Sequence, residues 1–336
     1  SDVVFVGYGI NAPERGWNDY AGIDVKGKTV LILVNDPDYE KKDLKGPFEG
    51  RAMTYYGRWT YKYEEAARQG AAAALIIHDT FPAAYPWGVV VSSWTGPQLN
   101  LDDANNHMDQ TQANGWITGE AAQKLFASSG KSLPQMVAAA KKKGFKPVPM
   151  GMKANLSFTS SIKRQASYNV VGILPGKVRP LDVVLYSAHW DHLGRCEPVN
   201  GDDICNGALD NATGTAGLIA LAEAHAKAGA ADRSMVFLAV TGEESGLLGS
   251  AWYGENPLYP HKNTVGGINM DGLNINGRTR DVTVVGAGKS ELEPILARHA
   301  AAQQRILKPE PTPEKGHFYR SDHFSLAKHG VPMIYF

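Results

Sequence analysis

Histidine and carboxylate side chains recur in the second half of the chain at points where strands are expected to end. The stretch YSAHWDHLG, from Tyr186 to Gly194, follows the apolar run LDVVL and places two histidines and an aspartate within four residues. Imidazole and carboxylate groups are the ligands that zinc commonly takes in proteins. A single corner of this kind also fits an ordinary polar turn, so its interpretation depends on the other segments.

Five candidate ligands lie at or just beyond expected strand ends, or in a loop that follows one. They are His189, Asp210 in ALDNATG, Glu244 in TGEESG, Asp271 in INMDG and His323 in RSDHF. Two divalent ions about 3.5 to 4 Å apart need a bridging carboxylate, because the ions repel each other. Two histidines, two terminal carboxylates and one bridging carboxylate form a sufficient set. The pattern therefore predicts a site for two zinc ions.

Two further acidic residues have expected roles beside these ligands. Asp191 follows His189 by two residues, where its carboxylate can accept the other N–H of the imidazole and fix the ring. Glu243 adjoins Glu244, and two neighbouring acidic side chains cannot both serve as equivalent ligands. We therefore expect Glu244 to coordinate metal and Glu243 to act as the base toward a water molecule.

The segments around these residues alternate between strand and helix patterns from about residue 168 onward. Strands are predicted by runs such as DVVLYSAH, SMVFLAVTG, VGGINMDG and PMIYF, and helices by GTAGLIALAEAHAKAG, SGLLGSAWYG and ELEPILARHAAAQQ. This alternation indicates an α/β fold with a mixed, largely parallel sheet flanked by helices. Active sites in such sheets gather at the carboxyl ends of strands, which is where the candidate ligands lie.

The first segment predicts a smaller, mixed α/β domain. Strands are expected at VVFVGYG, KTVLILV and AAAALIIHD, and a helix that Gly70 ends is expected at RWTYKYEEAARQG. The run VVVSS, residues 89–93, predicts another strand, EAAQKLFAS and LPQMVAAAKKKG predict helices, and MKANLSFTSSI alternates as a strand does. The change of pattern places a boundary between residues 145 and 165, and hence domains of residues 1–155 and 156–336.

Composition argues against several classes of function. Basic and acidic side chains number 34 each, so neither nucleic acid nor an anionic membrane surface is indicated as a partner. The longest apolar stretch, around GAAAALII, is far shorter than the roughly 20 residues that cross a bilayer. No signal peptide begins at Ser1, so we expect either a removed leader or an internal fragment.

The chain has two cysteines, Cys196 and Cys205, which lie nine residues apart in a segment of loop-like composition. Two paired cysteines with no others in the chain favour a local disulfide over two free thiols. A disulfide in turn favours an oxidising compartment, so we expect a secreted or periplasmic protein.

Five motifs, in this order, resemble the M28 family of co-catalytic zinc aminopeptidases: HWDHLG, GALDNATGTAGLIALAEA, TGEESGLLGSAWY, NMDG and SDHFSLAKHGVP. The resemblance covers roughly residues 165–336. It implies two Zn²⁺ ions bridged by Asp210, with one ion also held by His189 and Asp271. The other ion would be held by Glu244 and His323.

The same resemblance implies further features of the site and of the activity. Glu243 would be the general base, Asp191 the orienting acid, and the peptide bond after Asp210 would be cis. The implied reaction is hydrolysis of N-terminal residues from peptides that carry a free N-terminus, with no prediction for side-chain preference or oligomeric state. Trp190, His192 and Tyr319 are interpreted as loop or packing residues.

The first segment resembles a protease-associated domain, which related peptidases carry as an insert in the catalytic domain. VFVGYGI, YAGIDVKGKTVLILV and EEAARQGAAAALII carry this resemblance. Relative to the family pattern, the opening helices and strand and the closing segment are expected to be missing from this chain.

Three alternatives remain beside the aminopeptidase interpretation. A carboxypeptidase or deacylase of the M20 type has a similar ligand set but carries a large lid insertion. Here 27 residues separate Glu244 from Asp271 and 52 separate Asp271 from His323, which argues against that insertion. Glutaminyl cyclases share the fold with one zinc ion, and relatives of the transferrin receptor keep the architecture as non-catalytic binding proteins.

Overall fold

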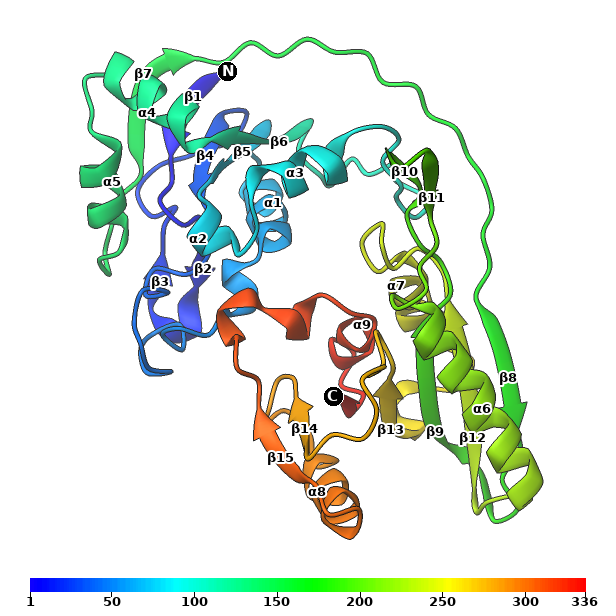
Figure 1. Ribbon diagram of the computed structural model, residues 1–336. Coiled ribbons are helices and arrows are strands. Elements are labelled where there is room, and N and C mark those ends of the chain that lie inside the picture. The colour runs from blue at the N-terminus through cyan, green and yellow to red at the C-terminus, as the bar shows by residue number, and fades with distance from the viewer. The chain divides into compact units, whose positions relative to one another are not determined.

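Apolar strands with alternating side chains organise each half of the chain into its own sheet. The computed structural model describes all residues, 1–336. Internal contacts divide the chain into two units of similar size. The first comprises residues 1–98, 102–163 and 312–316, and the second comprises residues 99–101, 164–311 and 317–336. Figure 1 shows the elements of both units along the chain.

The first unit contains a five-stranded sheet with the order β6-β5-β4-β1-β7. Its strands are β1 (Asp2–Phe5), β4 (Thr29–Leu33), β5 (Ala73–His78), β6 (Ala113–Thr118) and β7 (Val148–Lys153). All neighbours pair in parallel except β7, which is antiparallel to β1. Because successive side chains point to opposite faces, Phe5 and Leu31 enter one core and Val4 and Val30 enter the other.

Helices cover both faces of this sheet. They are α1 (Trp59–Arg68), α2 (Thr80–Ala83), α3 (Trp87–Trp94), α4 (Gly119–Ser128) and α5 (Leu133–Ala140). Phe126 of α4 and Ala140 of α5 belong to one core, and Ala66 of α1 belongs to the other. The short strands β2 (Asn11–Ala12) and β3 (Trp17–Asn18) form a separate antiparallel pair.

Two sequence-based expectations for this unit were wrong. Residues 89–93 form part of helix α3 rather than a strand: only Val90 is buried, whereas Val89 and Val91 are exposed. Strand preference of valine expresses packing against neighbouring strands, and this run has no strand partner. The alternating stretch 152–162 is extended only as far as Lys153, where β7 ends.

The second unit contains a five-stranded sheet with the order β16-β13-β9-β12-β8. Its strands are β8 (Val170–Leu174), β9 (Arg179–His189), β12 (Arg233–Val240), β13 (Thr264–Asn269) and β16 (Met333–Tyr335). Four strands are parallel, and β8 at the edge is antiparallel to β12. The prediction of an α/β fold with a mixed, largely parallel sheet between helices is therefore confirmed.

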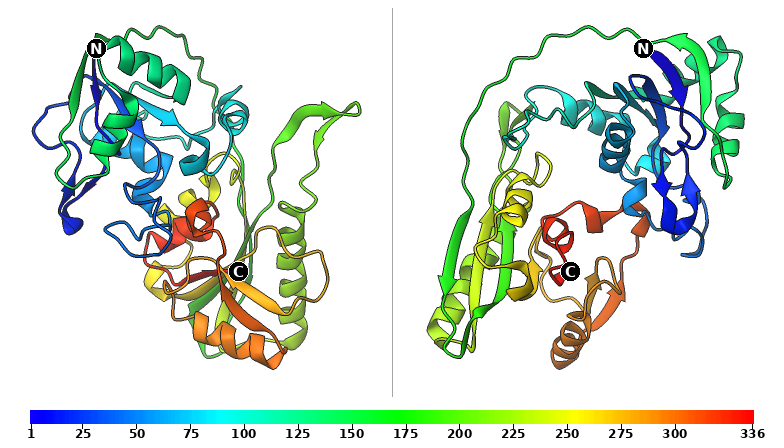
Figure 2. Two further views of the ribbon diagram at one scale, coloured as in Figure 1. Left: turned by 60° about the vertical axis from the view of Figure 1, so that its left-hand side comes forward. Right: turned by 180° about the vertical axis from the view of Figure 1, so that it is seen from behind.

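The two faces of this sheet bury different helices. Leu218 of α6 (Ala212–Ala228) packs with Ala188 and Phe237 on one face. Tyr253 of α7 (Leu248–Glu255) and Leu326 of α9 (His323–Ala327) pack on the other face. Helix α8 (Glu293–Ala302) lies beside a separate parallel pair, β14 (Asp281–Val284) and β15 (Ile306–Pro309), as the turned views in Figure 2 show.

The segment with the two cysteines is a hairpin rather than the expected loop. Strands β10 (Gly194–Val199) and β11 (Asp202–Cys205) pair in antiparallel orientation. The favoured disulfide is present between Cys196 and Cys205, with 5.8 Å between the two Cα atoms. Across the whole chain, every helix is too short or too polar to traverse a bilayer.

A buried lysine joins the loops at the carboxyl ends of the first unit's strands. Lys62 of α1 is fully buried, and its Nζ donates to the carbonyl oxygens of Tyr8 (2.6 Å) and Asn35 (3.0 Å). Burial lowers the pKa of Lys62, although attraction to the buried carboxylate of Asp36 opposes this change. Thr54 satisfies Asp36 with its backbone N–H and its hydroxyl.

Replacing this lysine tests how much the network stabilises the first unit. Lys62→Met removes the donor to two buried carbonyl groups and the positive charge that balances Asp36. We expect the free energy of unfolding of the first unit to fall by about 3 kcal/mol, as when one member of a buried pair is removed. Urea denaturation followed by tryptophan fluorescence measures the change.

The matched control is Lys124→Met, on an exposed face of α4 where the ammonium contacts only Glu120. This variant should leave the urea midpoint close to that of the unmodified chain. Equal midpoints for the two variants would contradict a stabilising role for Lys62.

Candidate active site

The candidate ligands meet at one edge of the second unit's sheet. His189 ends β9 in the middle of the sheet, Asp271 follows β13 on one side, and Glu243 and Glu244 follow β12 on the other side. Because these three strands are parallel, their carboxyl ends lie at the same edge. Side chains that are far apart in the sequence are therefore close together in space.

Asp210 enters this cluster from the turn before α6. The peptide bond between Asp210 and Asn211 is cis, as the family resemblance implied. The buried Asn211 side chain caps α6 by accepting from the N–H of Gly214, and it also accepts from Gly272. Its amide donates to the carbonyl oxygens of His189 (3.4 Å) and Met270 (3.0 Å). Asn211, which the sequence did not single out, thus ties the start of α6 to the ends of β9 and β13.

His189 is fully buried and faces two carboxylates. Its Nδ1–H donates to the backbone oxygen of Asp191 (3.1 Å), so Nε2 is the nitrogen that points into the cluster. There, Nε2 lies 3.1 Å from Oδ1 of Asp210 and 3.3 Å from Oδ1 of Asp271. Burial opposes the charged ring, but hydrogen bonds to these carboxylates outweigh burial and raise the pKa of His189 to about 11.

Asp191 has a different partner from the expected one. Its carboxylate is 3.7 Å from the His189 ring and instead accepts the backbone N–H groups of Glu243 (3.2 Å) and Glu244 (3.3 Å). The carbonyl oxygen of Asp191 orients the histidine in its place. Asp191 therefore positions two segments together, namely the imidazole after β9 and the acidic turn after β12.

Glu243 lies in an electrostatically crowded place. Burial raises the pKa of Glu243 to about 9, and the negative charges of Asp322 and Asp271 add to this effect, while His189 opposes it. Burial likewise raises the pKa of the neighbouring Asp322 to about 7. A carboxyl group with so high a pKa needs added positive charge nearby to act as a base at neutral pH.

A chain of buried hydrogen bonds fixes Asp271. The hydroxyl of Ser187 donates to Oδ1 of Asn269 (2.8 Å), and the amide of Asn269 donates to the hydroxyl of Ser321 (2.7 Å). Ser321 in turn donates to Oδ2 of Asp271 (2.6 Å), so the other carboxylate oxygen faces His189. Each of these hydrogen bonds is donated in the direction of Asp271. Carboxylates that bind metal ions usually accept hydrogen bonds of this kind from neighbouring residues.

Ligand-type atoms form two groups that share one residue. The first contains His189, Asp210 and Asp271, and the second contains His192, Asp210 and Glu244, with the atoms of each group within 4.8 Å of one another. His192, interpreted from the sequence as a loop residue, has its Nδ1 2.6 Å from Oε1 of Glu244. Its place in the HWDH stretch, next to Asp191, was the only sequence signal for it.

His323 belongs to neither group. As the first residue of α9 it is fully buried, with its ring against the aromatic rings of Phe318 and Tyr335 at centroid distances of 4.9 and 5.0 Å. Burial lowers the pKa of His323 to about 4, so the ring is neutral at physiological pH. The sequence predicts that His323 and Glu244 hold the same ion, but the two side chains are not in contact here. The role of His323 as a metal ligand stays a prediction.

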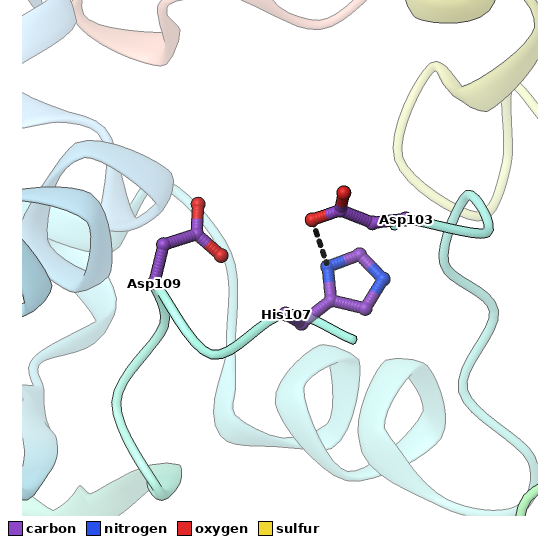
Figure 3. Close-up of side chains that lie close together, drawn as sticks. All are labelled: Asp103, His107 and Asp109. Carbon is purple, nitrogen blue, oxygen red and sulfur yellow. Dashed lines mark ion pairs between the residues drawn. The ribbon is translucent and has the colours of Figure 1, made fainter. Parts of the chain in front are cut away.

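A third group of ligand-type residues lies in the first unit, on the loop between α3 and β6. Asp103, His107 and Asp109 converge there, with 3.9 Å between Nδ1 of His107 and Oδ2 of Asp103 (Figure 3). All three side chains are partly or fully exposed, in contrast to His189. We assign this group no function.

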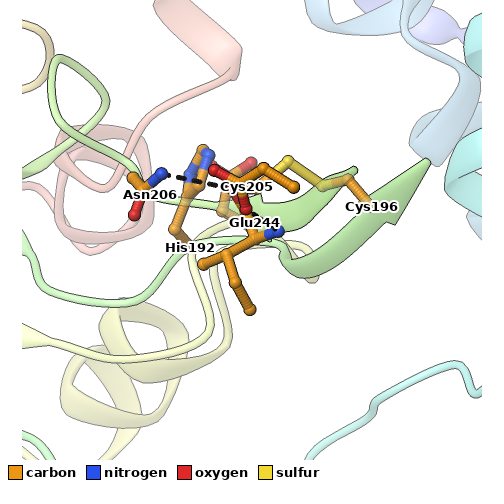
Figure 4. The surroundings of a disulfide bond; sticks show 7 residues. His192, Cys196, Cys205, Asn206 and Glu244 are labelled. Carbon is orange, nitrogen blue, oxygen red and sulfur yellow. Dashed lines mark hydrogen bonds and ion pairs between the residues drawn. A yellow bond between two sulfur atoms is a disulfide. The ribbon is translucent and has the colours of Figure 1, made fainter. Parts of the chain in front are cut away.

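The donor set of the second unit fits divalent cations. In the first group, a proton on a buried imidazole lies between two carboxylates. A divalent cation held by the same three side chains would replace that proton and balance both carboxylates. In the second group, His192 and Glu244 form a close ion pair (Figure 4) beside Asp210. Nitrogen and carboxylate ligands in these combinations suit zinc.

Comparisons with known proteins place the second unit in a family. Residues 169–336 match the sequence model of peptidase family M28. Mouse (Mus musculus) aminopeptidase NAALADL1 is 31% identical over 137 residues, which cover 38% of this chain and 17% of that protein.

Two solved structures resemble the whole chain. The aminopeptidase from Aneurinibacillus sp. strain AM-1 matches with 21% identity and a TM-score of 0.49, over 100% of this chain and 65% of that one. BSAP, a zinc aminopeptidase from Bacillus subtilis, matches with 19% identity and a TM-score of 0.39, over 100% and 64%. This chain therefore spans less than two thirds of the length of each of these relatives.

The family match includes every strand of the second unit's sheet and all the side chains that gather at its edge. It covers half of the chain and agrees with the motifs that the sequence showed. This chain belongs to peptidase family M28.

Proposed function

We propose that this chain is a zinc-dependent aminopeptidase that removes N-terminal residues from peptides with a two-ion site. The observation that carries this proposal is the position of Asp210, whose carboxylate belongs to both groups of ligand-type atoms. A shared carboxylate between two sets of ligands is what two neighbouring cations require. Family membership supports a peptidase, and the related aminopeptidases support the class of substrate.

Each proposed zinc ion would be bound by a different set of side chains. His189 and Asp271 would hold one ion, Glu244 would hold the other, and Asp210 would bridge them. The sequence predicts His323 as the nitrogen ligand of the second ion, although the structure does not place that ring beside Glu244. When bound, two zinc ions polarise a carbonyl group and make water acidic enough to attack near neutral pH.

Glu243 is the proposed general base. It adjoins Glu244, its backbone is held by Asp191, and its carboxyl group lies near His189 and Asp271. Positive charge at the two ligand groups would lower the pKa of Glu243 and leave it ionised at neutral pH. Glu243 would then take a proton from the attacking water and return it to the leaving amine.

The proposal extends to the first unit and to the location of the protein. The first unit would be a protease-associated domain, which its sequence resembles. The disulfide between Cys196 and Cys205 supports secretion or a periplasmic location, because such bonds persist in oxidising compartments.

A one-zinc glutaminyl cyclase is the main competing function, and the shared position of Asp210 argues for two ions instead.

Glu243→Gln is the direct test of the general base. The amide cannot accept a proton, so kcat on aminoacyl anilides should fall by about 10²- to 10⁴-fold. Two zinc ions per chain should remain bound, as measured by elemental analysis. The matched control is Glu244→Gln, which should lose zinc first. Loss of metal in Glu243→Gln, or unchanged turnover, would overturn the assignment.

Metal removal tests the dependence on zinc. Dialysis against a chelator should abolish hydrolysis of aminoacyl anilides, and added zinc should restore it. The metal-free chain should also melt at a lower temperature, because a ligand at 100 times its Kd stabilises the native state by about 2.7 kcal/mol. A chelated chain that keeps full activity would contradict a metallopeptidase.

Ser321→Ala tests the hydrogen-bond chain that holds Asp271. Without the hydroxyl, Asp271 loses its donor, and zinc affinity at the first ligand group should fall about 10- to 100-fold. Zinc titration of the metal-free protein measures this change. Ser234→Ala is the control, since Ser234 is equally buried and hydrogen-bonded at the opposite end of β12. Equal affinities in the two variants would remove the proposed role of Ser321.

A further inference from the structure

A glycine-rich loop follows β14 and has no role in the proposed mechanism. Its sequence is VVGAGKS, residues 284–290, and it leads from the end of β14 toward α8. Gly286 and Gly288 both have left-handed backbones, with φ of +71° and +84°. The backbone N–H of Val285 donates to the carbonyl oxygen of Tyr335 (3.0 Å). The loop is therefore joined to β16, a strand of the sheet that carries the candidate ligands.

Gly286 allows this loop to pack on Phe318. A Cβ atom at Gly286 would collide with the Phe318 ring, so only glycine fits between the backbone and the ring. The same ring lies against His323, with 4.9 Å between the ring centroids. His323 in turn contacts Tyr335, whose hydroxyl donates to the carbonyl oxygen of Asp271 (3.4 Å). Phe318 therefore connects the loop to the residues of the candidate active site.

Lys289 adds a positive charge at this place. Its Nζ lies over the Phe318 ring, 5.1 Å from the centroid, where the face of an aromatic ring attracts a cation. The side chain is exposed, and it forms no ion pair with an acidic side chain of the chain. Glu293, the acidic residue that contacts this loop, accepts the N–H of Gly288 instead (2.6 Å). The ammonium group is therefore positioned beside the site and is open to a ligand.

The spacing limits how far a bound anionic group can lie from the reacting bond. The distances from Phe318 to Lys289 and to His323 allow at most about 10 Å between the ammonium group and the imidazole. An ion pair with the ammonium takes up about 3 Å of this distance. The remainder is about the length of two extended residues. Two carboxylates of a peptide lie within that range of the cleaved bond: the side chain of an N-terminal aspartate or glutamate, and the C-terminal carboxylate of a dipeptide or tripeptide.

We propose that Lys289 is a specificity-determining residue that binds a carboxylate group of the substrate. This inference rests on the proposed peptidase function, and it names peptides with an acidic N-terminal residue, or very short peptides, as the preferred substrates. The ion pair forms at an exposed side chain, so kcat/KM for the charged substrate should exceed that for a neutral analogue by about 2- to 5-fold. Added salt should reduce this preference, because ions in solution screen exposed charges.

Two matched pairs of substrates test the inference in the presence of zinc. Glutamyl anilide is compared with glutaminyl anilide, and trialanine is compared with trialanine amide, so the members of each pair differ in one charged group. The charged member should have the higher kcat/KM in at least one pair, and that pair identifies which carboxylate binds. Lys289→Met should bring the ratio within that pair to about one, whereas Lys289→Arg should keep the preference.

The matched control is Lys262→Met. Lys262 is also exposed, but it lies just before β13 begins at Thr264, at the opposite edge of the sheet from the candidate ligands. This variant removes the same charge and should keep the ratio of the unmodified chain. Each ratio compares two substrates on one protein sample, so a partial loss of folded protein in a variant does not change it.

The outcomes separate this inference from the proposed function. An unmodified chain that hydrolyses the charged and neutral members of both pairs equally well would overturn the inference and leave the peptidase intact. A preference that Lys289→Met keeps would do the same. An unmodified chain that hydrolyses none of the four substrates would contradict the proposed function, and this inference with it.

Discussion

Carboxylate crowding at one edge of a sheet is the constraint on which the rest of this site depends. Asp210, Asp271, Glu243 and Asp322 gather around a single fully buried imidazole, and burial and mutual repulsion raise the pKa of Glu243 to about 9. Such a set is unstable without added positive charge, because like charges at short range in a partly buried place cannot all be ionised. Divalent cations bound here would resolve this conflict and would leave Glu243 ionised.

The fold supplies the remaining requirement, which is a fixed geometry for the crowded groups. Three adjacent parallel strands end at one edge, so residues far apart in sequence meet there. Side chains without a direct chemical role then join the strand ends: Asn211 links α6 to two strands, Asp191 links His189 to the acidic turn, and Ser321 holds Asp271. Each of these interactions is local, but together they position the same small group of ligand atoms.

The sequence predicted the parts of this site that follow from strand ends. His189, Asp210 and Asp271 were placed together because each follows a recognisable strand or precedes a recognisable helix. The partner of Asp191 could not be predicted, since spacing cannot decide whether a carbonyl oxygen or a carboxylate meets an imidazole. The contact of His192 with Glu244 was not predicted, because it depends on a hairpin whose composition is typical of a loop. Residues 89–93 were assigned to a strand because valine preference was read without the neighbours that decide it.

The central claim is that one carboxylate, Asp210, bridges two zinc ions at the ends of β9, β12 and β13. Crystals of the zinc-loaded chain, measured on both sides of the zinc absorption edge, test this claim most directly. The account predicts two anomalous peaks about 3.5 to 4 Å apart with the Asp210 carboxylate between them. A single peak at this edge of the sheet, or two peaks that Asp210 does not join, would contradict it.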